Sequence, residues 1–141
     1  MSEKHHAKKR GVSLILRLAV ASLLIGAAIP KFMGGLGSTA AYFQTIFKDT
    51  WLPMPLVKLH GMLTPFLEAG IAVWLLSGVR LKQAWIVAAL FMISLAFGMV
   101  VVKQYDTAAH NYFYVLICCA GLYFSPSGCC SADGKKESCH K

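Results

Sequence analysis

The sequence predicts an all-α membrane protein, a bundle of four transmembrane helices with a short interfacial helix between the first and the second. Hydrophobic residues make up 57% of the 141 residues and charged residues 14%, and the mean hydropathy is +0.58. A soluble domain is about half apolar and a quarter charged. The apolar residues also gather in four runs, and a helix needs about 20 of them to cross the hydrocarbon of a bilayer. This composition excludes a disordered tail protein, a soluble nucleic-acid module and a disulfide-stapled secreted scaffold.

The first run covers residues 12–29 and is broken only by Arg17 and by serines. It ends at Pro30 and Lys31, and Met33 can extend it. Its length and its near absence of charge predict the first transmembrane helix.

The longest connection, residues 34–54, follows this run. Glycines open it and prolines close it, and between them aromatic residues stand at positions 42, 43 and 47. Those spacings can share one face of a helix. We therefore expect a short helix over residues 40–47 lying in the membrane interface, with an irregular loop as the alternative.

Three further runs complete the bundle. The second, residues 55–77, carries Lys58, His60 and Glu68, whereas the third, residues 84–102, contains no charged residue. The fourth, residues 109–124, is short but begins with aromatic residues, which suits a membrane interface. The resulting organisation is a basic N-terminal tail over residues 1–11, a membrane domain over 12–125 and a cysteine-containing tail over 126–141.

Basic residues near the helix ends predict the orientation, because cytoplasmic segments carry the excess of Lys and Arg. With the N-terminus inside, the inner segments hold nine of them: Lys4, Lys8, Lys9, Arg10, Arg80, Lys82, Lys135, Lys136 and Lys141. The outer segments hold three: Lys31, Lys48 and Lys103. We expect a multi-pass protein of the bacterial plasma (inner) membrane with both termini cytoplasmic. The net charge of +8 is then explained by basic residues that set the orientation in the membrane. We expect the lipid bilayer as a partner and no binding of nucleic acid.

Two charges lie within predicted spans, where an ionised group is costly unless it is paired or hydrated. On antiparallel helices Arg17 and Glu68 would differ in depth by only about 7 Å at the rise of an α-helix. We therefore expect them to form an intramembrane polar pair. Two roles stay open, a buried pair that sets helix register and a polar surface that faces a substrate.

A second polar cluster is expected near the outer face. Lys31 ends the first helix, His60 lies in the first turns of the second and Asn111 opens the fourth. Imidazole can carry protons or bind a quinone carbonyl near neutral pH, so these three residues form a candidate ligand or proton site. The alternative is that Lys31, Lys58 and His110 reach to the lipid headgroups.

All five cysteines lie in the last 24 residues, which does not fit a secreted disulfide framework. Cys129, Cys130, Cys139 and His140 are a candidate soft-metal site by ligand type, although their spacing matches no strong structural zinc pattern. Cys118 and Cys119 fall within the fourth predicted helix, where free cysteine commonly serves as a small packing residue.

Several short motifs together resemble the DoxX family of small four-helix bacterial membrane proteins. The resemblance covers about residues 14–124. It is carried by Arg17 and Leu18, by Gly26 through Lys31 and Phe32, by the Pro53 and Pro55 approach, by Glu68, Ala69 and Gly70, by residues 75–80 (Leu-Leu-Ser-Gly-Val-Arg), and by Asn111 and Tyr112. It implies an integral membrane protein. Some members are subunits of a thiosulfate:quinone oxidoreductase and others associate with oxidative-stress or sulfur-handling enzymes. No catalytic residue carries over, and the tail beyond Ser125 is not part of the resemblance.

Three functions remain open at this stage. The first is a membrane subunit of a quinone- or thiol-linked redox complex, with a redox enzyme as partner. The others are a soft-metal or small-solute transporter that uses the cysteine pairs, and a non-catalytic membrane assembly protein. No haem, flavin or iron–sulfur signature is present in the sequence, which leaves quinone as the candidate cofactor and leaves open whether the protein is an enzyme.

Overall fold

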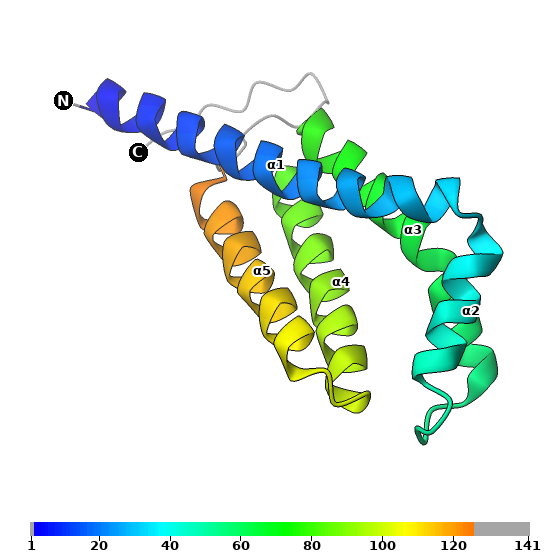
Figure 1. Cartoon of the computed structure of the whole chain (residues 1–141). Helices are drawn as coiled ribbons and strands as arrows, with labels where there is room; N and C mark the ends of the chain where they lie inside the picture. Colours follow the sequence, from blue (N-terminus) through cyan, green and yellow to red (C-terminus); the bar gives the residue numbers. More distant parts are fainter. Residues whose placement is uncertain (1, 126–141) are drawn as a thin grey trace.

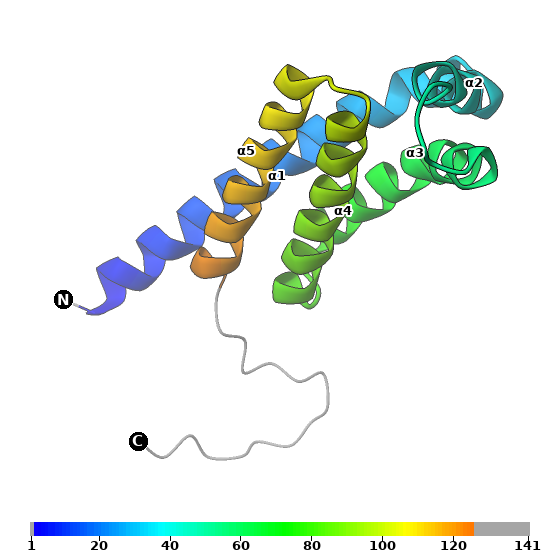
Figure 2. The same cartoon turned by 90° about the horizontal axis from the view of Figure 1, so that it is seen from below.

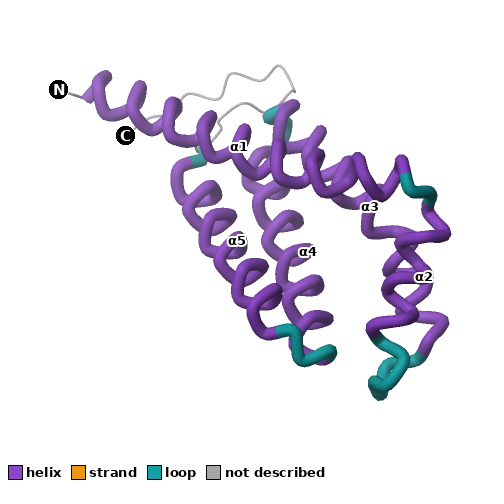
Figure 3. The backbone as a smooth tube through the Cα atoms, viewed as in Figure 1, coloured by secondary structure: helices purple, strands orange, loops and turns teal. Residues whose placement is uncertain are grey.

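The computed structural model describes residues 2–125, and all regular secondary structure in this range is α-helical. It forms five helices: α1 (Ser2–Met33), α2 (Leu36–Ile46), α3 (Met54–Ser77), α4 (Leu81–Val101) and α5 (Tyr105–Phe124). Figure 1 shows their arrangement, and Figure 3 shows that short loops join them. The expected all-α class is confirmed for this part of the chain.

The helices begin and end close to the apolar runs, with two differences. α5 starts at Tyr105 and α1 at Ser2, so each begins before its apolar run. The segment expected as an N-terminal tail is therefore helical from Ser2 onward. Polar residues such as Glu, Lys and Arg are good helix formers, and hydropathy marks only the part of a helix that lipid or a core can cover.

The helix expected within the long connection forms as α2, which excludes an irregular loop over residues 36–46. α2 packs along the first half of α3 (Figures 1 and 2). The close approach depends on Gly61, because a Cβ there would lie 3.2 Å from the Cα of Ala40 and 3.1 Å from the Phe43 ring. α2 thereby contributes side chains to the interior of the protein.

Two apolar clusters hold the helices together. The larger joins α1, α3, α4 and α5 through buried residues such as Val20, Leu75, Trp85 and Cys118. Gly121 admits the Trp85 indole so closely that a Cβ would lie 2.4 Å from its ring atoms. The smaller cluster joins α2, α3, α4 and α5, and its buried members are Phe43, Phe47, Val57, Met99 and Ala108.

Three helical segments are long and apolar enough to cross a membrane: Gly11–Met33, Met54–Ser77 and Leu81–Val101. Large apolar side chains are exposed on each of the four long helices, for example Ile15, Val73, Leu90 and Leu116 at 60–67%. An outward apolar surface of this kind is what contact with lipid requires. These segments indicate a multi-pass membrane protein.

Candidate functional site

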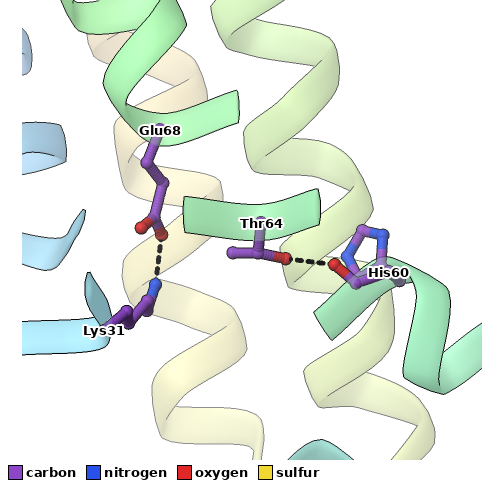
Figure 4. Close-up of polar contacts among 4 residues, drawn as sticks. All are labelled: Lys31, His60, Thr64 and Glu68. Carbon is purple, nitrogen blue, oxygen red and sulfur yellow. Dashed lines mark hydrogen bonds and ion pairs between the residues drawn. The ribbon is translucent and has the colours of Figure 1, made fainter. Parts of the chain in front are cut away.

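The central polar feature is an ion pair between Lys31 and Glu68 (Figure 4). Lys31 lies in the last turn of α1, and its Nζ donates a hydrogen bond to Oε1 of Glu68 in the middle of α3. The side chain of Glu68 is 3% exposed and that of Lys31 26%. A carboxylate this deeply buried is stable only when it is paired, and Lys31 provides the compensating charge.

The second carboxylate oxygen of Glu68 is unsatisfied. Oε2 is buried, and no donor in the described part of the chain reaches it. Buried polar atoms nearly always have a hydrogen-bond partner, and a charged group left without one costs more than a neutral group. Oε2 therefore has room for one further hydrogen-bond donor, such as a water molecule or a ligand group.

Lys31 and Glu68 line a cavity of about 460 Å³, here called the polar pocket. All five helices contribute to its wall, which consists of Pro30, Lys31, Ser38, Thr39, Tyr42, Phe43, Thr64, Glu68, Leu95, Met99 and Asn111. Binding sites for small molecules are commonly concave, about 300–1,000 Å³ in volume, and mainly apolar with a few polar groups. The polar pocket has this character.

Local sequence explains how the polar side chains converge. His60, Thr64 and Glu68 are four residues apart on α3 and so lie on one face of the helix (Figure 4). Gly35 adopts a φ of 83° at the start of α2, a conformation that glycine tolerates without strain. This turn brings α2 back along α3, so that Thr39 and Tyr42 reach the same pocket as Glu68.

The three residues expected as one ligand or proton site are divided between two cavities. Lys31 and Asn111 line the polar pocket. His60 lines a neighbouring cavity of about 250 Å³, here called the apolar pocket. Its ring meets the Phe43 ring edge-on at 6.2 Å, and its carbonyl oxygen accepts a hydrogen bond from the Thr64 hydroxyl at 2.8 Å (Figure 4).

The expected contact between Arg17 and Glu68 is not formed. Arg17 instead donates from Nε to the carbonyl oxygen of Leu75 and from Nη2 to that of Leu76, both at 2.7 Å. The last carbonyls of a helix lack partners within the helix, so the guanidinium caps the end of α3. Because α1 and α3 are antiparallel, the start of the apolar part of α1 meets the end of α3, and Lys31, near the end of α1, meets Glu68.

Two features of the polar pocket were not predicted from the sequence. Lys31 was expected in a ligand or proton site near the outer face, and its pairing with Glu68 was not anticipated. The contribution of α2 was also missed, although hydroxyl-bearing residues at positions 38, 39 and 42 were a visible signal. The other polar residues near the start of α3 and α5 stay outside this pocket: Lys58, Asp106 and His110 are exposed.

The cysteines of α5 do not line either pocket. Cys118 is buried and Cys119 is exposed. Within residues 2–125, no group of three or more His, Cys, Asp or Glu side chains is arranged to hold a metal ion. The candidate soft-metal site of Cys129, Cys130, Cys139 and His140 lies outside the described residues.

Comparison with known proteins corrects the resemblance drawn from the sequence. The matching family model is that of methylamine utilisation protein MauE, over residues 9–123, so the assignment to the DoxX family was wrong. The motifs behind that assignment are mainly helix ends and small packing residues, which many small membrane bundles need. No curated protein and no solved structure matches the chain. Because the family match spans most of the chain and every residue of the polar pocket, the protein belongs to the family of methylamine utilisation protein MauE.

Proposed function

We propose that this protein crosses the bacterial inner membrane four times, with both termini in the cytoplasm and a single membrane domain over residues 12–125. Support for α5 as the fourth span comes from its 20 residues, which extend about 30 Å as a helix. Its outward residues Phe113 and Leu116 are more than 60% exposed. The nine-to-three distribution of basic residues supports the orientation.

Within that topology the protein serves as a membrane subunit of a quinone-linked redox system, and the polar pocket binds the quinone ring. The observation that carries this proposal is the Lys31–Glu68 pair on the wall of a pocket, with Oε2 of Glu68 unpartnered among the described residues. An ammonium donates hydrogen bonds and a carboxylate accepts them. Lys31 would therefore bind a quinone carbonyl, and Glu68 would accept a hydrogen bond from the hydroxyl of the reduced quinol.

The remaining wall suits the same ligand. Phe43, Leu95 and Met99 offer an apolar surface to a flat ring, and an aromatic side chain favours offset or edge contacts with another π-system. When bound, a quinone would exchange two electrons and two protons with a redox enzyme that associates with this subunit. By its family, we place this system in methylamine utilisation or in a related oxidation of small amines.

A binding measurement tests the proposal. The full-length protein in lipid nanodiscs is titrated with a benzoquinone that carries one isoprenyl unit and with its quinol, and binding is followed by quenching of tryptophan fluorescence. Lys31→Met should weaken binding of the quinone, and Glu68→Gln should weaken binding of the quinol, each by at least about tenfold, as expected for losing a charge-assisted hydrogen bond.

The control variants are Lys58→Met and Asp106→Asn, because both side chains are exposed and line neither pocket. They should bind as the unaltered protein does. Since a single change at the ion pair leaves a buried charge, the double variant Lys31→Met/Glu68→Gln is measured as well, after circular dichroism has confirmed its helicity. Absence of quinone and quinol binding by the unaltered protein would refute the proposed function.

A further inference from the structure

The apolar pocket lies next to the polar pocket. Its lining consists of Phe43, Phe47, Leu52, Leu56, Val57, His60, Ser94, Leu95, Phe97, Gly98 and Met99. Three of these side chains, Phe43, Leu95 and Met99, also line the polar pocket. The two cavities are therefore neighbours, and side chains of α2 and α4 belong to the walls of both.

The chemistry of the apolar pocket differs sharply from that of its neighbour. Its wall is almost entirely hydrocarbon and aromatic. The hydroxyl of Ser94 already donates to the carbonyl oxygen of Phe91 at 2.7 Å, and the His60 ring packs edge-on against Phe43. The pocket contains no charged side chain, so it suits an alkyl or isoprenyl chain rather than a polar head.

Gly98 gives this pocket part of its room. A Cβ at that position would lie 3.3 Å from Cζ of Phe47, so any larger side chain on this face of α4 would project into space that the pocket now occupies. By contrast, a Cβ at Gly70 on α3 would meet nothing within 4 Å. The two glycines therefore offer a matched pair, one that shapes the pocket and one that faces outward.

The apolar pocket lies between α3 and α4, which diverge towards the start of α3 and the end of α4 (Figure 1). Two of its lining residues, Leu56 of α3 and Phe97 of α4, are 55% and 51% exposed. They belong to the outward apolar surface that faces hydrocarbon in a membrane. The apolar pocket therefore borders the bilayer on one side and the polar pocket on the other.

We infer that the ligand is a lipid-tailed quinone whose tail leaves the polar pocket past Phe43, Leu95 and Met99, occupies the apolar pocket and passes between α3 and α4 into the bilayer. This inference rests on the proposed function, and it adds the substrate class and the route of entry. Methionine is unbranched and flexible, so Met99 can yield to a passing chain. The ligand enters laterally from the membrane.

Tail length tests the inference. Benzoquinones with the same ring and with no, one or two isoprenyl units are titrated against the full-length protein in nanodiscs. Each buried methylene strengthens binding about fourfold, so the first unit should raise affinity at least tenfold. In Gly98→Leu this gain should fall to threefold or less while the tail-less ring binds as before. Gly70→Leu should retain the whole gain, which controls for partition of longer tails into lipid.

Each result separates the two proposals. If none of the quinones binds, the proposed function itself fails. If the tail-less ring binds and added isoprenyl units bring the same gain in Gly98→Leu as in the unaltered protein, the tail site is refuted and the ring site stands. A quinone with a photoreactive group on its first isoprenyl unit should label residues 94–99. Labelling confined to other helices would overturn the inference. So would a phospholipid acyl chain that stays in the apolar pocket when the tailed quinone is bound.

Discussion

The partner of Glu68 can be identified by two double-mutant cycles. The first combines Lys31→Met with Glu68→Gln, and the second combines Arg17→Met with Glu68→Gln. In the structure Lys31 contacts Glu68, whereas Arg17 binds the carbonyl oxygens of Leu75 and Leu76. The first pair should therefore be strongly coupled in its effect on the free energy of unfolding, and the second should not.

The size of the coupling follows from burial. Removing one member of a buried ion pair costs about 3–5 kcal/mol. Lys31 is 26% exposed and Glu68 only 3%, so we expect the lower end, about 3 kcal/mol, for each single variant. The double variant leaves no isolated charge and should cost about as much as one single change, which corresponds to a coupling free energy of about 3 kcal/mol. Leu75 is seven residues beyond Glu68, roughly 10 Å along α3, so the Arg17 cycle should be additive within about 0.5 kcal/mol.

The assay is equilibrium unfolding of the purified protein in mixed detergent micelles, followed by far-ultraviolet circular dichroism and tryptophan fluorescence. Trp74 and Trp85 report on α3 and α4, and coincidence of the two signals checks that unfolding is two-state. A coupling free energy for Arg17 and Glu68 that equals or exceeds that of Lys31 and Glu68 would refute the assignment of the ion pair.

Three further predictions use the same unfolding assay or a simple labelling reaction. Gly121→Ala should destabilise the protein by about 1–3 kcal/mol, the usual cost of overpacking, because its Cβ would lie 2.4 Å from a buried indole ring. Gly70→Ala has open space and should show no such loss. Arg17→Met should cost about 2–3 kcal/mol through its two lost charge-assisted hydrogen bonds, and Arg17→Lys should recover only part of this; full recovery would contradict the two-carbonyl cap. Cys119 is exposed and Cys118 is buried. In a variant whose tail cysteines are replaced by serine, N-ethylmaleimide in detergent should therefore label Cys119 at least tenfold faster than Cys118. Equal labelling rates would be inconsistent with this packing.

Local properties of the chain determined much of the fold. Hydropathy and helix formation act over neighbouring residues, so the sequence alone located all four long helices and the short helix between the first two. It also identified Glu68, Lys31 and Asn111 as candidate functional residues, because charged and amide side chains are rare within apolar runs. Short motifs carried too little information to distinguish one family of small membrane bundles from another, and the family assignment failed for that reason.

Only the tertiary structure decided which groups meet. The pairing of Glu68 depends on how α1 tilts and rotates against α3, and neither quantity is encoded in spacing along a single helix. Arg17 donates hydrogen bonds to the free carbonyl oxygens at the end of α3, and it does not pair with the carboxylate of Glu68. The two pockets likewise depend on the return of α2 along α3 and on the divergence of α3 from α4. A cavity is a property of packing among several helices, whereas the sequence of one helix specifies only which faces it can bury.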